Sequence, residues 1–408
     1  MTLSRIGRIS RALVASMAVV LGMSACGGYT VGFMWVLGTQ YNQIAGFKID
    51  DFTGNLTDMV GSPYSSGGTN PVSITVRTGG NFVFVVNKGT TDSSGNPNHD
   101  GNVAVFSVGE DGVLTSQGTY TTAGQSPVWA QADATGTFLY VVDSRSPAYN
   151  GTTDLNGDIT VFLVDGTTGR LQIVPNQQIK NAQGQQLNYF EVGPAPTMLR
   201  ASGACVYTLD TGDQTIYPYG LGGSGQLTIQ VTGPIKTGAK NLTSISAAGN
   251  NIYLTDAGTN QILPYAPGSN CNLSSQVNGA VANLGSSTDP VYSMTDSKNQ
   301  YLYVLNHGNT VPNSTNANST ISAFTILSTG QLQPLLDGPN NPYAVGNGPV
   351  CMVEDPSNQY VYTSNNNDGT VTGKFINQRN GQLTDLPRGS TFQATGLATC
   401  LAVSGNVD

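Results

Sequence analysis

A short apolar segment that ends in Asn or Asp recurs along the whole chain. Each copy alternates β-branched or aromatic residues at a period of two, which is the pattern of a β-strand. The copies are Phe82–Asn87, Phe138–Asp143, Val206–Asp210, Ile252–Asp256, Tyr301–Asn306 and Tyr360–Asn365, with a divergent first copy at Phe33–Gly38. Seven copies of one strand predict a repeat architecture in which each unit packs against the next.

Three further strands accompany each copy. One has the form G-x-I-x-x-F, the next begins G-x-L-T, and the last follows a G-x-x-P turn such as Gly68–Pro71. The leucines of the G-x-L-T strands are Leu56, Leu114, Leu171, Leu227, Leu273, Leu332 and Leu383. Four antiparallel strands in each of seven units predict an all-β fold, a seven-bladed β-propeller.

The phase of the repeat predicts how the ring closes. The chain opens with Phe33–Gly38 and lacks the preceding strand, whereas an extra copy of that strand stands at Gly396–Asn406. We expect this C-terminal strand to complete the N-terminal blade, because closure removes unpaired sheet edges. The long insertions follow the same strand of their units, so we expect them on one face. They are Thr90–Asp100, Ser144–Asn156 and Thr310–Asn318.

The N-terminal residues have the pattern of an export signal. Residues 1–25 carry three arginines and no acid, with an apolar run at 12–20 that is too short to span a bilayer with confidence. The segment Met23–Gly27 resembles a bacterial lipobox, which implies lipidation of Cys26. Gly27 after this cysteine favours the outer membrane.

These features predict three regions and a location. We expect a lipoprotein signal peptide at 1–25, a short anchor linker at 26–32 and the propeller at 33–408. The mature protein is then exported and held in the cell envelope through a lipid at Cys26, without spanning the membrane. We expect it to be a monomer.

Charge narrows the range of partners. Only 10% of the residues are charged, and removal of residues 1–25 leaves 13 Lys and Arg against 24 Asp and Glu, a formal charge of −11. A surface of this sign repels phosphate backbones, so we expect no nucleic-acid partner. The mature chain has four cysteines beyond Cys26 in no C-x-x-C pair, and we expect most of them to be small buried residues. They are Cys205, Cys271, Cys351 and Cys400.

The segments Asn70–Asn87, Gly157–Asp165 and Gly381–Gly389 carry a family resemblance. With them in view, the chain resembles the lactonase-type seven-bladed propellers, which are 6-phosphogluconolactonase-like and related to surface propellers with a Tyr-Val-x-Asn repeat. The resemblance covers about residues 33–406. It implies a lactone hydrolase, whose family commonly places a His directly after the Pro that begins the inner strand. This chain has other residues there, namely Val72, Val128, Thr197, Val291 and Val350.

Two sets of side chains are candidates for a site. A polar residue ends each repeated strand, and we expect these residues to form a ring at the channel mouth, either as a functional surface or as turn-stabilising groups. They are Asn87, Asp143, Asp210, Asp256, Asn306 and Asn365. The second set departs from the repeat, with His307 as general base and Arg145 or Arg200 stabilising an oxyanion, beside Glu354.

No motif indicates a metal or a cofactor. The sequence has no H-x-H, no HExxH and no paired Cys, so we expect neither. The leading hypothesis is an envelope scaffold that binds a small molecule, a carbohydrate or a protein through the loops of one face. The alternative is a lactone hydrolase that acts on a sugar lactone or a related carbohydrate acid.

Overall fold

The computed structural model describes residues 29–230, 233–275, 279–283, 289–308, 318–335 and 341–405. The predicted signal peptide, the lipidation site Cys26 and most of the insertion at 310–318 lie outside these residues. Within the described ranges one helical turn occurs, η1 (Ser269–Cys271), and no helix is long and apolar enough to cross a membrane.

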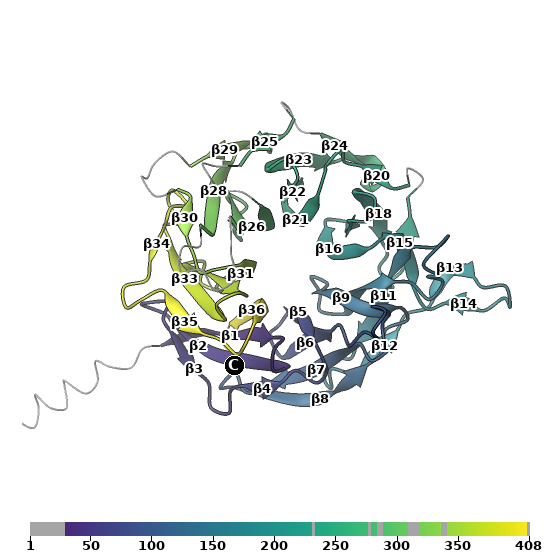
Figure 1. The fold of residues 1–408 in the computed structure, drawn as a ribbon, viewed down its shortest axis with the longest axis horizontal. Helices are drawn as coiled ribbons and strands as arrows, with labels where there is room; N and C mark the ends of the chain where they lie inside the picture. Colours follow the sequence, from purple (N-terminus) through teal and green to yellow (C-terminus); the bar gives the residue numbers. More distant parts are fainter. Residues whose placement is uncertain are drawn as a thin grey trace, which may run out of the picture.

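Seven antiparallel sheets stand around a central axis as the blades of a propeller (Figure 1). The inner strands, one for each blade, are β36 (Ala398–Gly405), β5 (Pro71–Val76), β9 (Gln125–Ala132), β16 (Pro196–Ser202), β21 (Leu242–Ala248), β26 (Pro290–Thr295) and β31 (Pro349–Glu354). The second strands are β1 (Thr30–Gly38), β6 (Phe82–Asn87), β10 (Phe138–Arg145), β17 (Cys205–Asp210), β22 (Asn251–Asp256), β27 (Tyr301–Asn306) and β32 (Tyr360–Asn365). We number the blades one to seven in this order.

Two more strands complete each blade toward the rim. The third strands are β2 (Gln43–Asp50), β7 (Asn102–Val108), β11 (Asn156–Val164), β18 (Thr215–Leu221), β23 (Gln261–Pro267), β28 (Thr320–Ile326) and β33 (Thr370–Ile376). The outer strands are β3 (Leu56–Asp58), β8 (Leu114–Tyr120), β12 (Leu171–Ile173), β19 (Leu227–Ile229), β24 (Leu273–Ser275), β29 (Leu332–Pro334) and β34 (Leu383–Asp385). Each predicted marker leucine begins an outer strand, so the predicted four-stranded unit is confirmed.

Short additional strands pair with the third strand in six blades. They are β4 (Tyr64–Ser65), β15 (Phe190–Pro194), β20 (Ile235–Lys236), β25 (Val281–Ala282), β30 (Tyr343–Ala344) and β35 (Thr391–Gln393). Blade three also carries a separate hairpin of β13 (Asn176–Lys180) and β14 (Gln186–Leu187).

The predicted closure of the ring is confirmed. The C-terminal strand β36 pairs antiparallel with β1, with Met34 opposite Val403 and Val36 opposite Leu401. Blade one is therefore built from both ends of the described chain, which meet in Figure 1.

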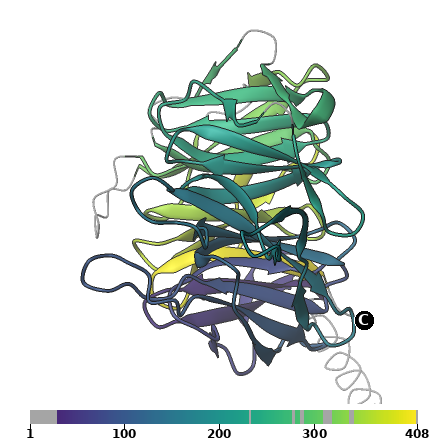
Figure 2. The ribbon, with the colours of Figure 1, turned by 90° about the vertical axis from the view of Figure 1, so that its right-hand side faces the viewer.

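The two faces of the disc differ in their loops. We call the face at which the inner strands begin and the second strands end the upper face. The opposite face is the lower face. The loops after β6 and β10 belong to the upper face, and Figure 2 shows the loop after β6 standing out from the disc. The turns between third and outer strands belong to the lower face.

Three of the four cysteines are buried, as expected, but all four are paired in disulfides. Cys205 forms a disulfide with Cys271, and Cys351 with Cys400. The partners lie 66 and 49 residues apart, but adjacent blades bring their Cα atoms to 5.6 Å and 5.1 Å, within the range that a disulfide spans. The second disulfide joins inner strands β31 and β36, so it fastens the closing strand to blade seven.

An aromatic latch joins neighbouring blades. In four blades, an aromatic residue lies three positions before the end of the second strand. Its side chain donates a hydrogen bond to the carbonyl of a glycine in a turn of the next blade. The latches are Trp35 to Gly112 (3.1 Å), Tyr253 to Gly330 (3.0 Å), Tyr303 to Gly381 (2.9 Å) and Tyr362 to Gly54 (2.6 Å). Each glycine has a positive φ, which suits glycine in these tight turns.

Three blades lack the latch at the same position. Phe84 has no hydroxyl, and the Tyr207 hydroxyl is buried without a partner among the described residues, because Cys271, in its disulfide with Cys205, stands where the other turns have glycine. In blade three, the Tyr140 hydroxyl makes no hydrogen bond to the described residues, although Gly225 occupies the turn of blade four. The Tyr140 hydroxyl therefore does not join its blade to the next one.

Tyr303→Phe should destabilise the protein by about 1–3 kcal/mol, because the buried Gly381 carbonyl loses its partner. Tyr140→Phe removes the same atom at an unlatched position and should leave the melting temperature unchanged. Thermal unfolding of both variants under one scan rate tests this. Equal losses in the two variants would contradict a specific role for the latch.

Blade three contains two buried acids on one rung of its sheet. Asp143 of β10 lies directly opposite Asp158 of β11, both side chains are fully buried, and both accept from the Thr160 hydroxyl. Burial raises the pKa of Asp143 to about 7 and that of Asp158 well above its ordinary value, with Asp143 adding repulsion at Asp158. Asn87 and Asn102 occupy this rung in blade two and bond to each other at 3.0 Å.

Asp158→Asn should raise the melting temperature at pH 8 and change it little at pH 4, because it removes one of two buried groups that resist ionisation. The folded state keeps protons that the unfolded chain releases above about pH 4, so wild-type stability falls as the pH rises toward about 7. Melting temperatures of wild type and variant across this range measure the effect. Asp58→Asn, at an exposed acid, is the charge-matched control, and a parallel pH profile for wild type and Asp158→Asn would refute the explanation.

Candidate functional site

The six polar residues that end the second strands do not line the channel. They lie one strand outward from the inner strands, and each is at most 1% exposed. Their side chains hold the loops that return to the inner strand. Asp256, for example, accepts from the backbone of Asn241 and Lys240, and Asn87 donates to the carbonyl of Ser66. The structure thus favours the turn-stabilising role for this set.

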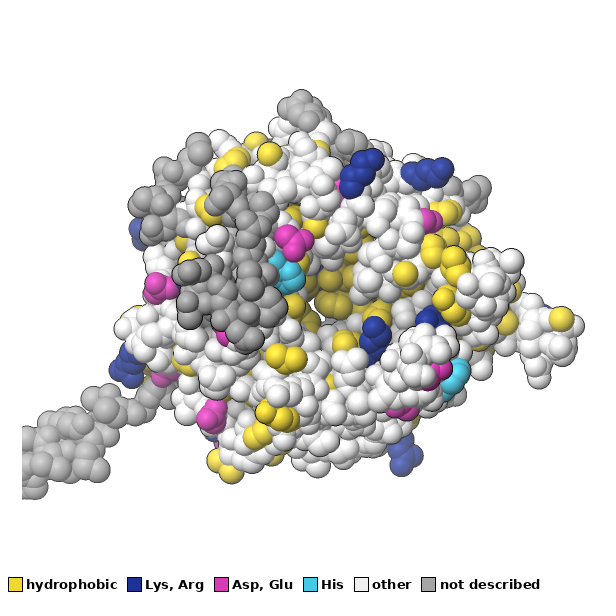
Figure 3. Space-filling view, in the orientation of Figure 1, with side chains coloured by type: hydrophobic (Ala, Val, Ile, Leu, Met, Phe, Trp, Pro, Cys, Tyr) yellow, Lys and Arg dark blue, Asp and Glu magenta, His cyan; other side chains and the backbone are white. Residues whose placement is uncertain are grey.

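The upper mouth of the channel is formed by one residue near the start of each inner strand, which in five blades is the residue directly after the proline. These residues are partly or largely exposed and are all Val or Thr, namely Val72, Val128, Thr197, Thr243, Val291, Val350 and Thr399. Figure 3 looks onto this face and shows apolar side chains in the central hollow. The mouth itself therefore offers few titratable groups, and any chemistry there depends on residues around its rim.

His307 lies at this rim, directly after β27. Its Nδ1 is 3.2 Å from Oδ2 of Asp289, and its backbone N–H donates to the Asp289 carbonyl at 3.0 Å. The pairing of Pro290 with Asn306 places these two flanking residues side by side. The carboxylate favours the tautomer with a proton on Nδ1, and the buried Nε2 has no partner within the described part of the chain. Figure 3 shows a histidine beside an acidic side chain at the hollow.

Two cations stand in the blades opposite His307. Arg145 ends β10 in blade three, where its guanidinium lies 4.6 Å from the ring of Tyr149 and donates to Asn96 and Gly95. Lys88 follows β6 in blade two and is half-buried. In a seven-membered ring, blades two and three face blade six, and Figure 3 shows basic side chains across the hollow from the histidine. The rim therefore carries a histidine–carboxylate pair facing positive charge.

Arg200 is in the wall of the channel rather than at its rim. It lines a cavity of about 280 Å³ with Trp129 and Tyr292, and its Nε donates to the backbone carbonyl of Ile245 at 3.5 Å. Burial raises the pKa of Tyr292, and the neighbouring Arg200 opposes the rise. The rings of Trp129 and Tyr292 are 6.4 Å apart.

Glu354 lies at the other end of the channel, at the lower end of β31. Its carboxylate accepts from the backbone of Ser297 at 2.7 Å, and burial raises its pKa to about 7. The structure thus brings His307 and Arg145 to one face, places Arg200 between the faces and sets Glu354 apart. The four candidates do not form a single cluster.

Sequence reasoning missed Asp289, Tyr292 and Trp129. Asp289 is the residue before the inner-strand proline, where the other blades have Asn70, Ser126, Ala195 and Gly348 at the same left-handed backbone position. Asp289 is the single acid at that repeat position. It is therefore itself a departure from the repeat, and this could have identified it from the sequence. Among the described residues, no group of three or more His, Cys, Asp or Glu is arranged to hold a metal.

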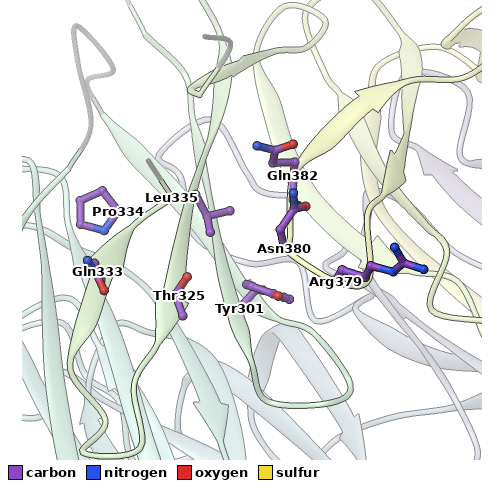
Figure 4. A pocket seen from close by; sticks show the side chains of 8 residues that line it. All are labelled: Tyr301, Thr325, Gln333, Pro334, Leu335, Arg379, Asn380 and Gln382. Atoms are coloured by element: carbon purple, nitrogen blue, oxygen red, sulfur yellow. The ribbon is translucent and has the colours of Figure 1, made fainter. Parts of the chain in front are cut away.

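A hollow of about 420 Å³ lies between blades six and seven (Figure 4). In Figure 4 the amides of Gln333 and Gln382 flank Leu335, while the Arg379 guanidinium points away from them. Arg379 and Tyr301 are the titratable side chains of this lining. It therefore lacks an acid–base pair comparable to His307 and Asp289.

Comparison with known proteins gives a family-level likeness. The model of the family "Lactonase, 7-bladed beta-propeller" matches residues 30–184. No curated protein matches this sequence.

Solved structures share the fold at low sequence identity. A periplasmic gluconolactonase from Pseudomonas aeruginosa has 15% identity and a TM-score of 0.67, covering 93% of this chain and 100% of that one. A putative 6-phosphogluconolactonase from Bacteroides fragilis has 16% identity and a TM-score of 0.66, covering 92% and 98%. Hydrazine synthase from Kuenenia stuttgartiensis also matches, at 17% identity, a TM-score of 0.53 and coverage of 86% and 100%.

Such low identities show the fold alone, since one fold hosts many activities. The chain is a seven-bladed β-propeller, and over residues 30–184 its sequence is similar to the lactonase propellers.

Proposed function

We propose that this propeller hydrolyses a small carbohydrate lactone at the upper mouth of its channel, with His307 as the general base. The observation that carries the proposal is the His307–Asp289 pair at the rim. The sequence similarity of residues 30–184 to lactonase propellers supports it. This replaces the scaffold as the leading hypothesis.

The chemistry needs only groups of this chain and water. Asp289 holds the His307 proton on Nδ1, which leaves Nε2 to take a proton from a water molecule. The water oxygen bonds to the lactone carbonyl carbon, the ring C–O bond breaks, and Nε2 returns the proton to the departing ring oxygen. The product is a hydroxy acid. Because Nε2 is buried in the structure, the rim has to open slightly to admit water and substrate.

The cations across the mouth suit the charge that develops. Negative charge appears on the carbonyl oxygen in the tetrahedral intermediate and on the carboxylate of the product. Arg145 is held in place by its stacking on Tyr149 and its bonds to the Asn96 loop, so it is oriented before substrate arrives. Arg145 and Lys88 therefore supply the stabilising charge.

The location remains a proposal from the N-terminal sequence alone. The signal-like residues 1–25 and the lipobox-like segment around Cys26 support a location at the cell envelope for this activity.

A binding scaffold is the second candidate. The specific observation in its favour is the row of Val and Thr at the mouth, where related enzymes are expected to carry a histidine. A scaffold would use the same face and its long loops without turnover.

A hydrolysis assay distinguishes the lactone hydrolase from the binding scaffold. It measures turnover of sugar and aliphatic lactones by the purified protein, corrected for spontaneous ring opening. His307→Ala should abolish hydrolysis, and Asp289→Asn should lower kcat at least about tenfold, because the tautomer is no longer fixed. His99→Ala, at the other histidine, should keep full activity. Hydrolysis that survives in His307→Ala would refute the assignment of the base, and no turnover on any lactone would leave the scaffold.

A further inference from the structure

A cavity opens on the lower face, between blades three and four. Its volume is about 680 Å³, within the range of small-molecule sites. The end of inner strand β9, the start of β10 and the turn Leu221–Gly223 of blade four line it. This cavity is on the face opposite His307, so it is separate from the proposed lactone site.

Tyr140 is the unusual residue of this cavity. Its repeat position holds a latch in four blades, whereas here the hydroxyl has no partner among the described residues, although the residue is only 2% exposed. The unpaired hydroxyl of Tyr207 is sealed from solvent, but that of Tyr140 is not. A buried aromatic hydroxyl that opens into a cavity without a partner is available to a ligand.

The other residues that line the cavity determine which chemical groups a ligand needs in order to bind there. Gln131 accepts from the backbone of Ala201 through Oε1, which leaves its amide hydrogens as donors. The lining carboxylate, Asp133, already accepts from Phe138 and Thr135, and the described residues of the lining include no Lys or Arg. Phe138 and Leu221 add apolar surface. The cavity therefore suits a neutral molecule that combines hydrogen-bond acceptors with apolar faces, and it has no cation to balance an anion.

We propose that this cavity binds a neutral saccharide of one or two sugar units. A sugar ring presents C–H faces to Phe138 and Leu221, and ring and hydroxyl oxygens to the donors of Tyr140 and Gln131. Burial raises the pKa of Tyr140 to about 12, so the hydroxyl stays a donor at neutral pH. The site does not depend on the lactone chemistry of the upper face.

A binding experiment with the full protein tests the proposal. Saturation-transfer NMR and then calorimetry measure the binding of glucose, galactose, N-acetylglucosamine and cellobiose. We expect at least one of these sugars to bind and Tyr140→Phe to weaken it about five- to tenfold, the effect of one hydrogen bond. Gly223→Leu should abolish binding, since a Cβ on Gly223 meets no atom within 4 Å and the larger side chain fills open space.

Two controls separate this site from other effects. Tyr303→Phe removes a latched hydroxyl elsewhere and should bind the sugar as wild type does, and His307→Ala should bind normally even if lactone hydrolysis is lost. Gluconate should not compete for the cavity. Failure of all four sugars to bind, or unchanged affinity in both Tyr140→Phe and Gly223→Leu, would overturn the proposal.

Discussion

The pairing of β36 with β1 is the constraint on which the other six blades depend. Each second strand is buried on both sides because neighbouring blades cover it, as the fully buried β6 and β27 show. That cover exists for every blade only if the ring is complete. The Cys351–Cys400 disulfide and the bond from the Thr399 hydroxyl to the Pro71 carbonyl tie the closing strand to the blades on either side. The channel and both of its faces exist because of this closure.

The repeat predicted the fold well because burial acts on every unit alike. Marker leucines begin outer strands, prolines begin inner strands, and the extra C-terminal copy closes blade one. The position of the polar ring was not predicted, because a sequence repeat does not show that neighbouring blades bury the ends of the second strands away from the channel. The disulfides were missed for a related reason, since contacts between adjacent blades join residues that are far apart in the chain.

The candidate site was predicted only in part. His307 and Arg145 were identified as departures from the repeat, and the structure places them in facing blades of the upper face. The partner of His307 required knowledge of the register, because Asp289 becomes its neighbour only through the pairing of β26 with β27. Arg200 and Glu354 face different parts of the channel, a distinction that depends on how far along an inner strand each residue lies.

The construction of blade one from two distant segments also affects how the protein is made. While the chain emerges from its N-terminus, β1 has no inner partner and presents an open, apolar strand edge until the last strand appears. The ribosome makes β36 after all the other described strands, so the nascent propeller stays incomplete for nearly the whole of synthesis of these residues. During that time the open edge of β1 is a site for pairing with other chains, and the arrival of β36 removes it.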